Sequence, residues 1–266
     1  VQALQAENES AAAGVALGAS FGGAIGATAT SGMGMGQIAE TIGLAAMTEL
    51  PLVVVNVQRG GPSIGLPTKT EQGDLLQAMF GRNGECPVPV LAASTAGDGF
   101  AVAIEAARIA CKFMTPVIVL TDVFLTNGSE PWRIPAVEDL PAIAAPAFDH
   151  ATPFQPYARN EWLARPWEVP GTPGREHRIG GLEKEDVTGA VSYDPLNHEA
   201  MVQLRARKVA RIADDIPELT IDGPDAGDLL VLGWGSTFGA IRTAVERAGR
   251  RRAKVAHAHL RYINPL

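Results

Sequence analysis

The sequence predicts an α/β fold built around a mainly parallel sheet. Residues 52–57 and 117–121 are apolar runs apart from Asn56 and the final Thr121, which is typical of strands buried on both faces. Predicted helices alternate with the strands over residues 1–125. Glycine is abundant, with 29 residues, and aromatic residues are only 6%, so the core depends on close backbone approach. Successive strand–helix units imply right-handed crossovers and a site at the carboxyl ends of the strands.

The elements of this first part follow from local patterns. Small residues predict a helix at 10–21, and a strand at 26–30 runs into a glycine-rich turn at 30–36. Further helices are predicted at 37–47 and 100–113. The remaining strands are predicted at 52–57, 89–93 and 117–121.

The second half of the chain changes character. Recurrent proline and three tryptophans predict a long irregular connector over residues 126–200, and connectors of this length are usually functional or form interfaces. A polar helix is predicted at 197–214. A second α/β unit then begins, with a strand and turn at 229–236, a helix at 237–248 and a strand at 254–260.

These patterns divide the chain into three parts: an α/β domain at 1–150, a connector with a helix at 151–222, and the start of a second α/β domain at 223–266. We expect both ends to be cut from a longer protein. Residue 1 falls beside a helix start, and Leu266 stands where an α/β domain normally continues.

Composition excludes several classes of function. The net charge is −7 with no basic block beyond residues 250–252, which argues against nucleic acid and anionic membranes as partners. No apolar run would cross a bilayer and no signal peptide opens the chain, so a cytoplasmic protein is expected. Cys86 and Cys111 are too few for a disulfide framework, or for an iron–sulfur cluster, which needs about four thiolates.

Two acidic residues, Glu7 and Glu9, precede an alanine-rich helix. One interpretation is compensation of the helix dipole. The other is a partly buried acid beside a cofactor, whose pKa burial would raise.

The glycine-rich segment at 30–36, which includes Ser31 and Gly32, predicts exposed backbone N–H groups that a ligand can approach closely. It is a weak dinucleotide signal, because the acid expected about 20 residues later is missing. Arg59 could replace that acid in an NADP-type site, and a purely structural turn is the third interpretation.

Residues 57–70 leave the carboxyl end of a buried strand and contain Arg59 and Thr68. A guanidinium can hold a carboxylate in a fork, and this position is where α/β sites form. A surface ion pair in an ordinary loop is the alternative. His257 and His259 share one strand face and make a poor metal site, so packing or partner contact is expected there.

Several of these segments together resemble the pyrimidine-binding domain of thiamine-diphosphate-dependent 2-oxoacid:ferredoxin oxidoreductase alpha subunits. The matching segments are Gln-Ala-Glu at 5–7, Thr-Ala-Thr-Ser-Gly at 28–32, Gln-Arg-Gly-Gly-Pro-Ser at 58–63, Gly-Leu-Pro-Thr-Lys at 65–69 and Asn-Gly-Glu at 83–85. Asn-Gly-Ser-Glu-Pro-Trp at 127–132 and Gly-Gly-Leu-Glu at 180–183 are similar to the 2-oxoglutarate type in particular. Residues 229–265 are similar to the start of a transketolase-C-terminal-like domain.

The resemblance implies oxidative decarboxylation of a 2-oxoacid to acyl-CoA, with electrons passed to ferredoxin. Glu7 would hydrogen-bond the aminopyrimidine of thiamine diphosphate, Ser31 and Gly32 would line the cofactor, and Arg59 and Thr68 would hold the 2-oxoacid. A beta subunit would bind the diphosphate with Mg²⁺ and carry the iron–sulfur cluster, so the resemblance implies a hetero-oligomer.

Two positions depart from the family pattern: Met33 stands where proline is usual, and Ile64 where threonine is usual. These changes put activity or substrate preference in doubt. Two alternatives therefore stay open at this point, namely an NADP-type nucleotide-binding module and a non-catalytic interaction subunit.

Overall fold

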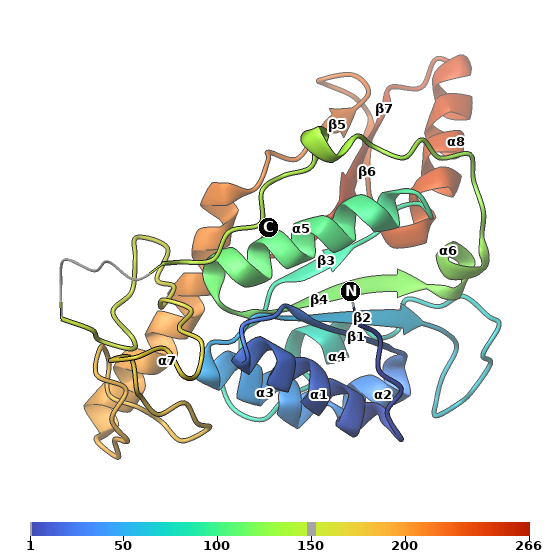
Figure 1. Cartoon of the computed structure of the whole chain (residues 1–266). Helices are drawn as coiled ribbons and strands as arrows, with labels where there is room; N and C mark the ends of the chain where they lie inside the picture. The colour runs from blue at the N-terminus through green and yellow to red at the C-terminus, as the bar shows by residue number, and fades with distance from the viewer. Residues whose placement is uncertain (1, 148–152) are drawn as a thin grey trace.

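A computed structural model describes residues 2–147 and 153–266 and has the α/β architecture that the sequence predicts (Figure 1). The main sheet has the order β1-β2-β4-β3-β8. Its strands are β1 (Gly26–Thr30), β2 (Leu52–Gln58), β3 (Val90–Ala92), β4 (Pro116–Asp122) and β8 (Tyr262–Asn264). β1 to β4 are parallel, and β8 pairs antiparallel with β3. The prediction of a mainly parallel sheet is confirmed.

Helices cover both faces of this sheet (Figure 1). One face packs on α1 (Glu9–Phe21), α2 (Gly32–Gln37), α3 (Ala39–Thr48) and α4 (Leu75–Phe80), and the other on α5 (Asp98–Phe113). Val54 of β2 faces the first group, whereas its neighbour Val53 faces α5. Helices thus exclude water from both faces, and this explains why β2 and β4 are mostly apolar.

The second α/β unit is small. Its sheet has the order β5-β7-β6, with β5 (Ile221–Asp222), β6 (Leu229–Trp234) and β7 (Val255–Leu260). The turn η3 (Gly235–Thr237) leads from β6 into α8 (Phe238–Arg250). The half-buried ring of Trp234 packs on the main core, so the unit is anchored to the first domain. The chain then returns to the main sheet as β8.

The later part of the connector docks at the amino ends of the strands, where Arg159, Arg165 and Lys184 contact residues just before β2. Between α6 (Val123–Asn127) and α7 (Pro195–Ala210), the described residues form no α-helix or regular strand and only one 3-10 turn, η1 (Val137–Asp139). α7 then runs into the turn η2 (Arg211–Asp215). Figure 1 shows α7 and the later, yellow part of the connector at the end of the sheet opposite to the arrowheads of β2 and β4.

Some elements differ from the sequence prediction. The helix expected at 37–47 is interrupted at Ile38, which ends α2 and begins α3. The short elements α4, α6, β5 and β8 were not predicted, because each has six residues or fewer and lacks a clear period. None of the helices in the described part of the chain is long and apolar enough to cross a membrane.

A buried ionic cluster joins the connector and α7 to the end of α3. The carboxylate of Glu49, which is 1% exposed, accepts hydrogen bonds from Lys208 at 2.7 Å and from Arg159. The Arg165 guanidinium donates to the carbonyl oxygens of Thr48 and Glu49. Burial alone would raise the pKa of Glu49, but Lys208 and Arg159 outweigh it and hold the pKa at about 2. The cluster therefore holds Glu49 ionised.

Glu49→Gln is expected to destabilise the protein by about 3 kcal/mol, because it leaves buried cations without their counter-charge. Urea unfolding at neutral pH measures this, with Glu246→Gln as control, since Glu246 belongs to an exposed pair with Arg242. The folded-state pKa of Glu49 lies below its unfolded value. Its contribution is therefore present above about pH 4.5 and lost as the pH falls toward 2. A Glu49→Gln protein as stable as the parent would contradict this.

Candidate active site at the carboxyl end of the sheet

Three of the predicted site residues line one cavity at the carboxyl end of β1 and β2. The cavity has a volume of about 200 Å³ and is lined by Ser31, Gly32, Met33, Arg59, Gly61, Pro62, Ser63, Asp74 and Gln77. Because β1 and β2 are parallel neighbours with Thr30 opposite Asn56, the residues that follow the two strands meet here. The sheet thus brings Ser31 and Gly32 to Arg59, as expected for an α/β site.

The glycine-rich segment is helical, which corrects the prediction of a turn at 30–36. Ser31 occupies the N-cap position of α2, and Gly32 begins the helix. A Cβ on Gly32 would stand 2.6 Å from both carboxylate oxygens of Asp74. Glycine therefore serves here for close packing and not for a left-handed turn. The absence of a side chain at Gly32 therefore lets the carboxylate of Asp74 approach the backbone at the start of α2.

Arg59 is half-buried and has free hydrogen-bonding capacity. Its Nε is buried without a partner, and within the described residues the guanidinium makes no hydrogen bond or ion pair. A surface ion pair, the alternative interpretation of Arg59, is thus not formed. A buried donor without a partner is costly, so this guanidinium is suited to an anionic ligand in the cavity.

The loop that follows Arg59 is folded back on itself. Gly60 N–H donates to the carbonyl of Lys69 at 2.9 Å, and Leu66 N–H donates to the carbonyl of Gly60 at 2.7 Å. Gly65 has a φ of +51°, and a Cβ there would overlap the Gly60 carbonyl, so this turn requires glycine. Thr68 lies on the loop, is exposed and does not line the cavity.

The two departures from the family pattern also lie around this cavity. Met33 lines it directly and is 37% exposed. Ile64 is 59% exposed on the loop. Neither side chain contributes to the main core, so both changes act on the site and its surroundings.

A polar network below the loop was not anticipated from the sequence. Asn56 Nδ2 donates to Asp74 Oδ2 at 3.0 Å, and Asp74 N–H donates to Gln58 Oε1 at 3.3 Å. Gln58 in turn donates to the carbonyl of Thr121 on β4 at 3.2 Å. The signal available in the sequence was the presence of two polar residues, Asn56 and Gln58, in the otherwise apolar strand β2. This network holds Asp74 in place in the lining of the cavity.

Glu7 is exposed in the isolated chain, two residues before α1 begins. The sequence expectation of partial burial is therefore not met within this chain. Asn8 is the N-cap, with its side chain accepting from Ala11 N–H, and Glu9 is the acid in the first turn. Cγ of Glu9 lies 2.8 Å from where a Cβ of Gly34 would stand, so the start of α1 adjoins the glycine-rich segment. Glu7 does not line the cavity beside Arg59, and its exposed carboxylate is accessible to a partner.

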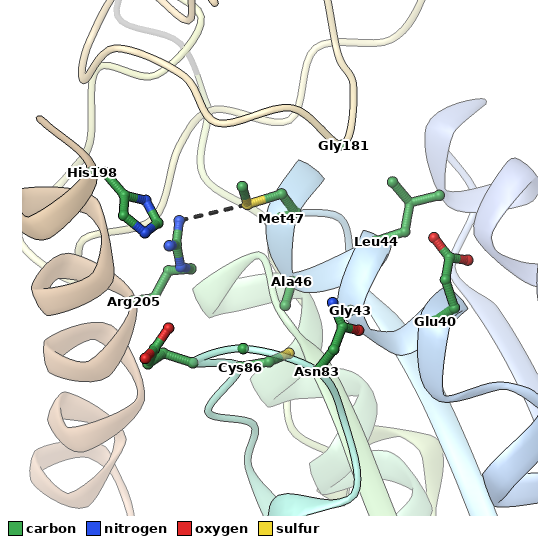
Figure 2. A pocket seen from close by; sticks show the side chains of 12 residues that line it. Glu40, Gly43, Leu44, Ala46, Met47, Asn83, Cys86, Gly181, His198 and Arg205 are labelled. Carbon is green, nitrogen blue, oxygen red and sulfur yellow. Dashed lines mark hydrogen bonds between the residues drawn. The ribbon is translucent and has the colours of Figure 1, made fainter. Parts of the chain in front are cut away.

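A second cavity, of about 320 Å³, lies between α3, α7 and the loop at 83–86. Figure 2 shows Arg205 and His198 reaching from α7, with a contact from Arg205 to the sulfur of Met47 on α3. Met47 lies near the amino end of β2, so this cavity is separate from the cavity beside Arg59. Elsewhere, Nε2 of His257 lies 3.2 Å from Nδ1 of His259, and both imidazole rings pack against Phe238. Within residues 2–147 and 153–266 no group of three or more His, Cys, Asp or Glu could hold a metal ion.

Comparison with known proteins decides the family. The model of the thiamine-diphosphate-binding domain of pyruvate flavodoxin/ferredoxin oxidoreductases matches residues 1–193. The chain belongs to this family. It is 56% identical to the 2-oxoglutarate oxidoreductase subunit KorA of Mycobacterium tuberculosis, over all of this chain and 41% of that protein. It is 33% identical to the 2-oxoglutarate synthase subunit KorA of Archaeoglobus fulgidus, over 88% of this chain and 60% of that protein.

The fold agrees with a solved member of the family. A 2-oxoglutarate:ferredoxin oxidoreductase from Magnetococcus marinus, solved with 2-oxoglutarate, coenzyme A and succinyl-CoA bound, superposes with a TM-score of 0.93 and 36% identity. The match covers 99% of this chain and 46% of that chain. The chain thus spans about two fifths to three fifths of the length of these relatives. The resemblance inferred from the sequence is confirmed.

The residues present fit thiamine diphosphate as the family's cofactor. Arg59 offers a guanidinium with a buried Nε that has no partner, and Glu7 offers a carboxylate that makes no hydrogen bond or ion pair within the described residues.

Proposed function

We propose that this chain supplies the pyrimidine-binding half of the active site of a 2-oxoacid:ferredoxin oxidoreductase, with 2-oxoglutarate as substrate. The observation that carries the proposal is the cavity in which Ser31 and Gly32 meet the free guanidinium of Arg59. The similarity to subunits named for 2-oxoglutarate supports the choice of substrate. The same family assignment favours thiamine diphosphate over the NADP-type alternative.

Each residue has a separate task in this proposal. Glu7 hydrogen-bonds the aminopyrimidine ring and holds its proton in position. Ser31 and Gly32, which line the cavity, form the wall against which the ring lies. Arg59 binds the carboxylate of the 2-oxoacid through its free donors and orients the keto group. Thr68 contacts the same substrate from the loop. The cofactor supplies the carbanion chemistry of decarboxylation.

A partner completes the site. We propose that a beta subunit covers Glu7 and the loop after Arg59, binds the diphosphate with Mg²⁺, and carries an iron–sulfur cluster that passes electrons to ferredoxin. The two cysteines of this chain, Cys86 and Cys111, are free thiols, which suits the reducing cytoplasm. Coenzyme A is the expected acyl acceptor.

The test is an assay of the full-length protein co-expressed with its partner subunit. With 2-oxoglutarate, coenzyme A and an oxidised low-potential acceptor, we expect acceptor reduction that depends on all three. Pyruvate in place of 2-oxoglutarate should give a lower kcat/KM. A complex that assembles but neither binds thiamine diphosphate nor reduces the acceptor would support the non-catalytic alternative instead.

A further inference from the structure

A hydrogen bond from the side chain of Gln72 joins the loop that follows Arg59 to the second α/β unit. Gln72 is half-buried, and its Nε2 donates to the carbonyl oxygen of Trp234 at 3.0 Å. The two residues are separated by 162 positions in the sequence. Gln72 thus connects the end of the loop to the turn between β6 and α8.

The acceptor side of this contact is shaped for the glutamine amide. Gly235 follows Trp234 with a φ of +64°, and a Cβ on Gly235 would overlap Nε2 of Gln72. The Trp234 carbonyl also accepts from Thr237 Oγ1 at 2.7 Å, and the Gly235 carbonyl is 3.0 Å from Nε2 of His259. The turn is therefore rigid, and it leaves room for Gln72 only because residue 235 lacks a side chain.

The residues on either side of Gln72 reach the site itself. Glu71 accepts a hydrogen bond from Gly61 N–H at 3.1 Å, two residues after Arg59. Asp74 is the floor of the cavity and is fixed by Asn56. A shift of Gln72 would therefore displace both the backbone beside Arg59 and the carboxylate opposite it.

We propose that Gln72 is a positioning residue, which clamps the loop at 59–73 onto the second α/β unit and so sets the place of Arg59 for the 2-oxoacid. The inference rests on the proposed function for its consequence in catalysis. Its structural part, the clamp, is independent of that function. The second unit thereby influences substrate binding without touching the substrate.

The test uses the full-length protein assembled with its partner, as Gln72→Ala, Gly235→Ala and the double variant. Gln203→Ala is the matched control, because Gln203 is exposed on α7 and donates only to Glu199 of its own helix. Hydrogen exchange should be about fivefold faster at the amides of Gly60, Gly61, Leu66 and Lys69 in Gln72→Ala, the size expected for one lost neutral hydrogen bond. The control should exchange like the parent.

Steady-state kinetics then distinguish a role in positioning Arg59 from a general loss of enzyme activity. Gln72→Ala should raise the KM for 2-oxoglutarate about five- to tenfold with a smaller change in kcat. Gly235→Ala should produce the same rise by pushing the amide away. In the Gln72→Ala background, Gly235→Ala should raise KM little further, because the glutamine amide that the new Cβ would displace is already gone. A fully additive double variant would contradict a shared contact.

Two outcomes overturn the proposal. Loop exchange that is unchanged in Gln72→Ala removes the clamp, and this measurement needs no turnover. Faster loop exchange with an unchanged KM in an active assembly removes the positioning role. If the parent assembly turned over no 2-oxoacid, the proposed function would fail, and hydrogen exchange would still decide whether the clamp exists.

Discussion

Glu7→Gln in the full-length protein, assembled with its partner, should lower turnover of the 2-oxoacid by about a thousandfold. Glutamine keeps the shape of the side chain but cannot exchange a proton with the ring, and a positioned acid–base group contributes about 10²–10⁴-fold. Folding should be unaffected, because Glu7 is exposed and precedes the N-cap residue Asn8. Steady-state kinetics with saturating thiamine diphosphate measure the loss.

Glu9→Gln is the matched control, and it separates the two interpretations of this acidic segment. Glu9, and not Glu7, lies in the first turn of α1, where a carboxylate compensates the helix dipole. Its replacement should cost a few tenths of a kcal/mol in stability and change turnover by less than about twofold. If Glu7→Gln were fully active, or if both variants lost activity equally, the assignment of Glu7 as the cofactor's acid would be wrong.

The strands of the main sheet could be predicted from the sequence because the pattern that identifies each of them is local. β1 has the bounds predicted for it, β2 is one residue longer at its end, and β4 is one residue longer at each end. Strands buried on both faces leave long apolar runs between helices, and such runs are visible without any tertiary information. The strand order β1-β2-β4-β3-β8 was not predicted, because the handedness of the crossovers does not determine which strands are neighbours.

The glycine-rich segment shows where local patterns fail. Gly32, Gly34 and Gly36 predict a turn by propensity, yet they lie in the helix α2. Packing decides, because a Cβ on Gly32 would approach Asp74, and a Cβ on Gly34 would overlap Oγ1 of Thr30 and approach Glu9. The contacts with Asp74 and Glu9 join residues far apart in the sequence, so no short window of sequence contains them.

The same reason limits prediction of the site. Ser31, Gly32 and Arg59 could be placed together, because the ends of neighbouring parallel strands meet at one edge of the sheet. Gln72, Asp74 and the cluster around Glu49 could not, since each acts through partners that the chain brings from elsewhere. Glu7 and Thr68 remain predictions, because the surface that would cover them belongs to another chain in our proposal.

Arg59→Ala should lower kcat/KM for the 2-oxoacid by about 10²–10³-fold, mainly through KM. The guanidinium enters the cavity with its donors free, so a carboxylate gains charge-assisted hydrogen bonds that each contribute about 1.5–3 kcal/mol. Arg59→Lys keeps the charge but loses the planar fork, and we expect an intermediate loss of about tenfold. Arg247→Ala on the exposed side of α8 is the control and should behave like the parent.

The order of the two Arg59 variants tests the geometry of binding. If a point charge were enough, lysine would restore nearly all activity, and the fork would have no role. If both variants failed equally while thiamine diphosphate still bound normally, orientation and not charge would dominate. Unchanged KM values in both would show that Arg59 does not hold the substrate. Its free guanidinium would then need another anion, and the cavity beside Ser31 and Gly32 would lose its assignment to the 2-oxoacid.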